Sequence, residues 1–195
     1  MKATVTRLAV FASGGGSNAK ALLKYFRNHP QICISLFVSN KKDSGVFTLG
    51  EKNNVPTIWI SSADFKKPEV LLPLLQSHSV DYVILAGFLW LLPEFLIKKF
   101  PGKIINIHPS LLPKFGGKGM YGMHVHEAVR NAGEKISGCT IHLVNEKYDE
   151  GRIIFQAETP LAEDMTPEDI AREVLRLEHL CYGPAIEKYV LSENY

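Results

Sequence analysis

Short apolar runs alternate with amphipathic segments along the first hundred residues of the chain. Runs rich in β-branched and aromatic residues predict strands at residues 7–12, 32–39, 57–60, 82–86 and 104–108. The segments between them predict helices over residues 19–27, 46–53, 68–78 and 93–100. Because this alternation is typical of βαβ units, we expect an α/β fold with a Rossmann-like, mostly parallel sheet and helices on both faces.

After residue 113 the pattern changes. A Gly-rich stretch without periodicity precedes a predicted helix over residues 124–132, and two predicted strands follow at residues 136–144 and 152–159. Thr166-Pro167 followed by two acidic residues predicts the start of a last helix, which extends to about residue 189. We expect these C-terminal strands to extend the sheet with mixed direction, within a single domain over residues 1–195.

Composition narrows the function classes. The chain has 195 residues, 46% of them apolar and 22% charged, which are ordinary globular values. A net charge of +2 gives no indication of nucleic-acid or membrane partners. The longest uncharged apolar run, residues 82–92, is far shorter than the roughly 20 residues that span a bilayer. Three widely spaced cysteines and no secretory signal predict reduced thiols in a cytoplasmic protein.

Two polar residues interrupt the apolar strand predicted at residues 104–108. Asn106 and His108 are two positions apart, so their side chains lie on the same side of a strand, and Pro109 ends it. An amide can donate to a developing oxyanion, and an imidazole can donate or transfer a proton. Taken alone, the pair is equally consistent with buried polar groups that satisfy loop carbonyls.

A Gly-rich turn, residues 13–18, lies between the first predicted strand and the first predicted helix. Glycines allow close approach of the backbone to a ligand, and the amides of a helix N-terminus suit a phosphate. The Gly-Lys-Ser/Thr of a P-loop is absent. The spacing Gly14-x-Gly16-x-x-Ala19 approaches a dinucleotide motif, but residues 39–41 lack its acidic residue. A monophosphate site and a turn without a ligand remain open.

Two further segments carry candidate chemistry. Asp149 lies in a polar loop after the strand predicted at residues 136–144, and Gly151 permits a tight return. Residues 87–93 are apolar and follow a strand, so they form either core or one wall of a site for a flat aromatic ligand. The histidines have no spacing typical of a tight metal site, so we expect core or solvated histidines and no metal.

Residues 106–113, NIHPSLLP, resemble the signature of the folate-dependent formyltransferases almost letter for letter. His142-x-Val144, followed by Asp149-x-Gly151, is similar to a second signature of that family. The resemblance covers nearly the whole chain and is greatest to the branch whose acceptor is 5-phosphoribosylglycinamide. It implies the formyltransferase fold and transfer of the formyl group of 10-formyltetrahydrofolate to the amino group of this ribonucleotide in purine (IMP) biosynthesis, without a metal.

The resemblance also implies roles for individual residues. The catalytic residues of the family correspond to Asn106, His108 and Asp149. The implied reaction proceeds through a tetrahedral intermediate with general acid/base help. Gly16, Ser17 and Asn18 correspond to the family's phosphate site, and Glu178 to its contact with the ribose. The folate site corresponds to Phe88, Leu89, Trp90, Leu91, Leu92, Asn106, Asn145, Glu146 and Asp149. A monomer or a homodimer is consistent with these expectations.

Three departures from the family pattern accompany the resemblance. The loop of residues 116–122 is longer than usual, and is interpreted as either a lid or a surface loop. Trp90 and Leu175 stand where some members have basic residues that contact the folate tail and the phosphate, so the resemblance implies no such contacts at these two positions.

Other functions remain alternatives. Formyltetrahydrofolate hydrolases of the family usually have an additional N-terminal domain, and methionyl-tRNA formyltransferases an RNA-binding C-terminal domain. Sugar-nucleotide N-formyltransferases share the Asn-x-His and the Asp but lack this phosphate turn. A non-catalytic nucleotide-binding module would use the turn and would leave Asn106, His108 and Asp149 far apart.

Overall fold

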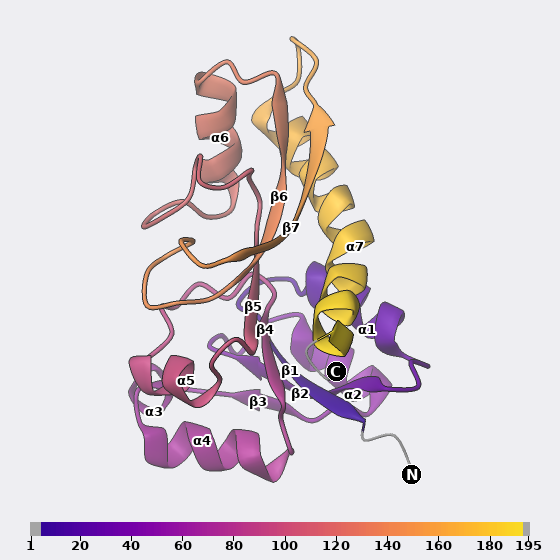
Figure 1. Cartoon of the computed structure of the whole chain (residues 1–195), viewed down its shortest axis with the longest axis vertical. Coiled ribbons are helices and arrows are strands. Elements are labelled where there is room, and N and C mark those ends of the chain that lie inside the picture. Colours follow the sequence, from indigo (N-terminus) through magenta and orange to yellow (C-terminus); the bar gives the residue numbers. More distant parts are fainter. Residues whose placement is uncertain (1–4, 193–195) are drawn as a thin grey trace. The chain divides into compact units, whose positions relative to one another are not determined.

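The computed structural model describes residues 5–192 and shows a mixed α/β protein. Backbone contacts divide the chain into two compact units, Met1–Ile105 and Asn106–Tyr195. Among the described residues, seven strands form a sheet in the order β3-β2-β1-β4-β5-β6-β7 (Figure 1). The predicted fold class, a mostly parallel sheet whose C-terminal strands differ in direction, is confirmed.

The first unit contains parallel strands connected by helices. Its strands are β1 (Thr6–Phe11), β2 (Ile32–Ser39), β3 (Thr57–Trp59) and β4 (Tyr82–Leu85). Its helices are α1 (Ser17–Phe26), α2 (Val46–Asn53), α3 (Ser62–Phe65), α4 (Pro68–Ser77) and α5 (Glu94–Lys99). β1 pairs in parallel with both β2 and β4, and β2 pairs in parallel with β3.

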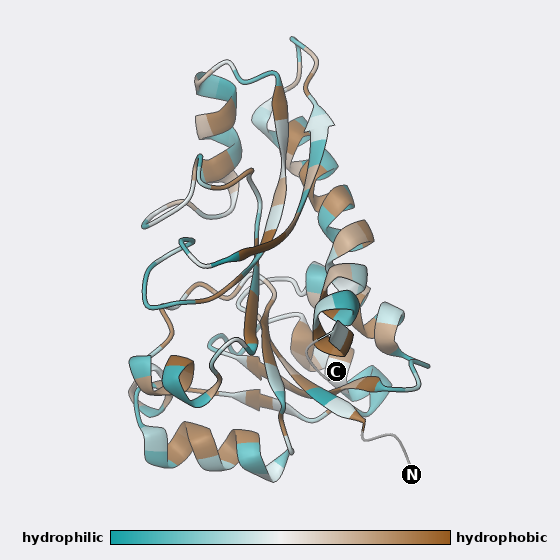
Figure 2. Cartoon of the chain, viewed as in Figure 1, coloured by the Kyte–Doolittle hydropathy of each residue, from teal (hydrophilic) through white to brown (hydrophobic). Residues whose placement is uncertain are grey.

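The core of the first unit explains why these runs form strands. Side chains of β1 and β4 are buried almost without exception, and Figure 2 shows apolar residues concentrated on these strands. Strands covered on both faces read as continuous apolar runs, which is the pattern of the sequence at β1 and β4. The helices contribute single apolar faces, such as Ala19, Leu22 and Phe26 of α1.

The second unit is built on an antiparallel pair. β5 (Ile104–His108) ends in this unit, and α6 (Met123–Asn131), β6 (Ile136–Leu143), β7 (Ile153–Pro160) and α7 (Pro167–Ser192) follow. β6 and β7 pair in antiparallel fashion, and the register shifts between Ile141 and His142. Helix α7 packs along both strands and against α6 (Figure 1). Gly138 of β6 has no room for a side chain, because a Cβ there would collide with the Ala157 carbonyl oxygen.

Most predicted elements are present within one or two residues of their expected ends. The predicted helix start at Thr166 is confirmed as a capping box: the Asp169 amide donates to Thr166 Oγ1 at 3.2 Å, and the Thr166 amide donates to Asp169 Oδ2 at 3.0 Å. The short helix α3 was not predicted, because four residues are too few to show a helical period. Pro93 precedes α5 as its N-cap, whereas the sequence predicted it inside the helix.

Candidate active site

The C-terminal end of β5 presents two polar side chains among apolar ones. Ile104, Ile105 and Ile107 are buried, as a central strand requires. Asn106 is half-buried, whereas His108 is only 4% exposed. An uncompensated imidazole at this depth is unfavourable, so the hydrogen bonds of His108 determine its protonation state.

His108 is held between a carbonyl and a carboxylate. Its Nε2 lies 2.8 Å from the Phe115 carbonyl oxygen. Because a carbonyl can only accept, Nε2 carries a proton, and Nδ1 faces Asp149 Oδ2 at 3.5 Å. Burial lowers the pKa of His108, while the charge of Asp149 and the bond to Phe115 oppose that decrease. The balance favours a neutral ring that can receive a proton on the side of Asp149.

His142 connects Asn106 to Asp149. Its Nδ1 donates to the Leu143 carbonyl oxygen at 2.9 Å, so in the neutral ring Nε2 accepts. Asn106 Nδ2 donates to this Nε2 at 3.1 Å, and the second amide proton of Asn106 stays available. The same Nε2 lies 3.6 Å from Asp149 Oδ1. The sequence predicted a core or solvated histidine here, and the signal that could have identified it was its place in the His-x-Val signature.

The carboxylate of Asp149 is the point at which these groups meet. It is 11% exposed and accepts a hydrogen bond from the Gly117 amide at 2.8 Å. Burial raises its pKa, but the contact with His142, the charge of His108 and the bond from Gly117 outweigh burial and lower it. Asp149 has a φ of 56°, in the left-handed region, which turns the chain back at the end of its loop.

The Gly-rich stretch after the signature is therefore attached to the site through its backbone. Phe115 and Gly117 provide the carbonyl and the amide that hold His108 and Asp149, and their φ values are 56° and 96°. Gly116 lies close to Asp149, since a Cβ on it would be 3.3 Å from the Asp149 Cβ. At these positions the stretch is part of the candidate site, because its backbone contacts His108 and Asp149.

The Gly-rich turn of the first unit has the geometry of an anion site. Gly16 adopts a φ of 76° as the N-cap of α1, and no side chain caps the helix. Ser17 and Asn18 occupy its first turn, which contains no acidic residue. The turn is fixed from outside, because the Gly45 amide and Ser44 Oγ both donate to the Gly14 carbonyl oxygen, at 3.1 and 2.9 Å. A helix N-terminus that no side chain caps is a suitable place for an anion.

The segment after β4 borders this turn within the first unit. The Ser13 amide donates to the Gly87 carbonyl oxygen at 3.1 Å, and the Leu89 amide donates to Ser13 Oγ at 3.0 Å. Side chains then alternate: Phe88 and Leu92 are buried, whereas Leu89 and Leu91 are each 49% exposed.

Aromatic packing holds Phe88 in the core of the first unit and places the half-buried Trp90 beside it. The Phe88 ring lies 5.4 Å from the rings of both Phe11 and Phe65, and the Trp90 ring lies 5.3 Å from that of Phe65. The Phe88 ring therefore serves packing, and a ligand at this segment would meet the backbone, the half-buried Trp90 and the exposed leucines.

The remaining predicted residues belong to the second unit. Asn145 and Glu146 are exposed in the loop before Asp149, and Asn145 Oδ1 accepts from the Lys147 amide at 3.0 Å. Glu178 is buried on α7, where its charge adds to burial in raising the pKa of Tyr182.

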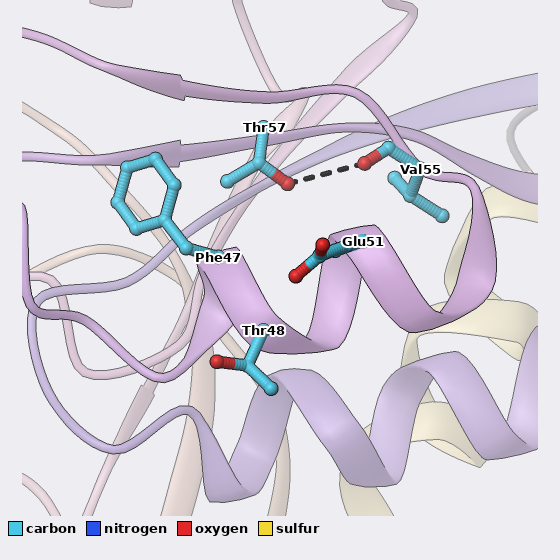
Figure 3. A pocket seen from close by; sticks show the side chains of 5 residues that line it. All are labelled: Phe47, Thr48, Glu51, Val55 and Thr57. Carbon is cyan, nitrogen blue, oxygen red and sulfur yellow. Dashed lines mark hydrogen bonds between the residues drawn. The ribbon is translucent and has the colours of Figure 1, made fainter.

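A separate open cavity of about 400 Å³ lies in the first unit (Figure 3). It is lined by Phe47, Thr48, Glu51, Val55 and Thr57, and the Thr57 hydroxyl donates to the Val55 carbonyl oxygen at 3.1 Å. None of the predicted site residues is among those that line it, so it is distinct from the candidate site.

No group of three or more His, Cys, Asp or Glu side chains within residues 5–192 is arranged to hold a metal ion. None of the helices in that range combines the length and apolar character that crossing a membrane requires.

The protein has a mostly parallel α/β sheet, and an amide, two imidazoles and a carboxylate meet near the ends of β5 and β6, an arrangement suited to acid–base group transfer. Residues 6–186 match the family model described as formyl transferase, and the chain belongs to this family.

Named relatives agree with this assignment. The chain is 43% identical over 189 residues to the chloroplastic phosphoribosylglycinamide formyltransferase of Arabidopsis thaliana, covering 90% of this chain and 62% of that protein. It is 34% identical to the phosphoribosylglycinamide formyltransferase of Bacillus subtilis, over 96% of both. The crystal structure of the Bacillus halodurans enzyme of that name matches with a TM-score of 0.86 and 30% identity, over 97% of each chain. The chain spans about three fifths of the length of the plant relatives.

Proposed function

We propose that the chain transfers the formyl group of 10-formyltetrahydrofolate to the amino group of 5-phosphoribosylglycinamide, giving N-formylglycinamide ribonucleotide and tetrahydrofolate. This places it in de novo purine (IMP) biosynthesis. The observation that carries the proposal is the contact network from Asn106 through His142 to Asp149 and His108. The matched family and the names of the relatives support the choice of substrates.

In the proposed mechanism, attack of the acceptor amine on the formyl carbon leaves negative charge on the formyl oxygen. Asn106 supplies a hydrogen-bond donor to this oxygen, because only one of its two amide protons is directed at His142. One such donor contributes about 3–4 kcal/mol to stabilisation of the transition state. His108 becomes a second donor once Nδ1, on the side of Asp149, takes up a proton, while Nε2 stays bonded to the Phe115 carbonyl.

Proton transfer is the task proposed for Asp149. The incoming nitrogen must lose a proton, and the departing N10 of the folate must gain one. Asp149 is ionised at neutral pH, since its pKa is lowered, and it faces a ring nitrogen of His108 and of His142. A carboxylate placed beside two imidazoles can pass the proton between the two nitrogens directly or through water.

Binding roles complete the proposal. Gly16, Ser17 and Asn18 hold the 5′-phosphate with the first-turn amides of α1. Glu178 accepts from the ribose hydroxyls.

The folate is proposed to contact the backbone of residues 88–92 together with exposed Leu89 and Leu91. Asn145, Glu146, Asn106 and Asp149 are the proposed partners from the second unit. No metal takes part in this scheme.

The organisation of the protein is also a proposal. Residues 1–195 act as one functional formyltransferase domain, as a monomer or a homodimer. A cytoplasmic location suits the free thiols of Cys33, Cys139 and Cys181.

The test is release of tetrahydrofolate from 10-formyltetrahydrofolate, measured with and without 5-phosphoribosylglycinamide. Turnover only with the ribonucleotide is the expected result. Turnover without any amine would instead identify a formyltetrahydrofolate hydrolase. Turnover in neither case would overturn the proposal, and amino-sugar nucleotides would be the next acceptors to assay.

A further inference from the structure

A buried hydroxyl on β6 holds the backbone that follows the signature strand. Thr140 is fully buried and has three hydrogen bonds. Its Oγ1 donates to the Ser110 carbonyl oxygen at 2.7 Å and accepts from the Leu112 amide at 3.0 Å. Gln156 Nε2 donates to the same oxygen at 2.8 Å. One threonine oxygen thus satisfies both a carbonyl and an amide of a segment that is neither helix nor strand.

Gln156 completes the arrangement from the neighbouring strand. Gln156 lies directly opposite Thr140 in the antiparallel pair of β6 and β7. Its Nε2 donates both to Thr140 Oγ1 and, at 3.0 Å, to the Leu112 carbonyl oxygen. Two side chains on adjacent strands therefore fix three backbone groups of residues 110–112.

Residues 110–112 lead directly into the backbone groups that hold the candidate catalytic pair. Ser110 Oγ donates to the Lys114 carbonyl oxygen at 2.7 Å, which closes the turn. The next residue, Phe115, accepts from His108 Nε2, and the Gly117 amide donates to Asp149. A displacement of residues 110–112 would shift both contacts at once.

We infer that Thr140 is a positioning residue for the formyl transfer: through residues 110–117 it fixes the orientation of His108 and Asp149, with Gln156 as its support. This inference rests on the proposed function for its kinetic consequence. The Thr140 hydroxyl does not touch the reacting atoms, because its hydrogen bonds are to Ser110, Leu112 and Gln156.

The chemistry requires a hydroxyl at this position. Valine has nearly the shape of threonine, but it would leave the Ser110 carbonyl and the Leu112 amide unsatisfied within the protein. The segment would then rearrange to satisfy them, since unpaired buried backbone groups are rare in native structures. Serine retains the hydroxyl and loses only a methyl group, which makes Thr140→Ser the matched control for Thr140→Val.

The kinetic test compares these two variants with the parent chain. For Thr140→Val we expect kcat to fall about tenfold to a hundredfold, as for other small displacements of catalytic groups. The KM for the ribonucleotide should stay within about twofold, because the proposed phosphate turn lies in the other unit. Thr140→Ser should restore kcat to within about threefold of the parent.

The pH profile distinguishes positioning from general damage. Asp149 is faced by the Gly117 amide, by His108 and by His142, while the charge of His108 acts on His126. Loss of the Gly117 bond removes one of the interactions that lower the pKa of Asp149. The acid limb of the kcat profile should therefore move to higher pH in Thr140→Val and stay in place in Thr140→Ser.

The position of His108 can also be tested without any substrate, and therefore independently of the proposed function. The His108 Nε2 proton, bonded to Phe115, should give a protected imidazole resonance in ¹⁵N-labelled protein, identified by its loss in His108→Gln. It should persist in Thr140→Ser and be lost or broadened in Thr140→Val, whatever the substrate. If it persists in a folded Thr140→Val, the inference is wrong.

If Thr140→Val does not fold, Gln156→Met provides the same test from the exposed side of β7. Weakening of the His108 resonance and a smaller fall in kcat are expected. A parental resonance and parental kcat in this variant would overturn the inference.

Discussion

The proton transfer proposed for this protein depends on one carboxylate, that of Asp149. Two imidazoles and one backbone amide face it, and it lies in a loop that the sequence alone does not distinguish from an ordinary turn. Its lowered pKa keeps it charged at neutral pH, which a proton acceptor requires.

Replacing Asp149 with Asn removes the charge and keeps the shape. The amide oxygen can still accept from Gly117, so the loop should be retained, but it cannot take up a proton. We expect kcat for formyl transfer to fall about 10²–10⁴-fold. Glu150→Gln, one exposed position further on, is the control and should retain the parental rate. Parental turnover in Asp149→Asn would remove this carboxylate from the mechanism.

The burial of His126 should make the stability of the protein depend on pH. It is 5% exposed on α6, and within the described residues its Nδ1 has no hydrogen-bond partner. Burial, and then the charge of His108, lower its pKa. The unfolded chain therefore binds a proton near pH 6.5 when the folded chain does not. The stability from the neutral ring is present above about pH 6.5 and is lost as pH falls through the folded pKa.

The measurement is the free energy of unfolding by urea between pH 7 and pH 5. One such group contributes a slope of at most about 1.4 kcal/mol per pH unit. His126→Gln should flatten the slope of the parent, although His108 remains and is shifted in the same direction. His124→Gln, an exposed position on the same helix, should leave the slope unchanged. Parallel slopes for His126→Gln and the parent would contradict this explanation.

At the scale of elements, backbone contacts fix the turns that the side chains use. α2 approaches the Gly-rich turn of β1 and α1 closely because Gly45 has no side chain. A Cβ on Gly45 would collide with the Gly15 carbonyl oxygen, whereas a Cβ on Gly14 would meet nothing within 4 Å. The sequence gives no reason to treat Gly14 and Gly45 differently, and only the packing shows that Gly45 alone has no room for a side chain.

Gly45→Ala should therefore destabilise the protein by about 1–3 kcal/mol, as expected for overpacking against backbone. It should also raise the KM for the ribonucleotide, because the turn next to it must move. Gly14→Ala is the matched control for stability and should unfold at the same denaturant concentration as the parent. Equal stability of the two variants would show that the turn adjusts without cost.

At the scale of the whole molecule, substrate binding should appear as added stability. A ligand that binds only the folded chain adds about 2.7 kcal/mol at a hundred times its Kd. We expect 5-phosphoribosylglycinamide to raise the thermal midpoint and the ribonucleoside without phosphate to have a much smaller effect.

Ser17→Asp locates this effect in the turn. An acidic residue in the first turn of α1 is favourable for the free helix but repels a phosphate. The variant should keep the parental midpoint without ligand and lose the shift with the ribonucleotide. An undiminished shift would place the phosphate elsewhere.

The contacts within the second unit argue against the alternative function, a non-catalytic nucleotide-binding module. A nucleotide-binding module would use the turn but would give no reason for Asn106, His108 and Asp149 to meet. In the second unit His142 joins Asn106 to Asp149, and Asp149 faces His108. These contacts support the proposed proton transfer, for which a binding module has no need.

The sequence by itself determined the order and type of nearly all elements, because strand and helix periods and capping signals are local properties of the chain. It also predicted a site at Asn106 and His108 from their place at a strand end, and it predicted the family from its signatures, which the family match confirms. Only the tertiary structure showed the contacts of His142 with Asn106 and Asp149, the support from Thr140 and Gln156, and the attachment of residues 115–117 to the candidate site. These depend on contacts between residues up to 44 positions apart, which no local pattern records.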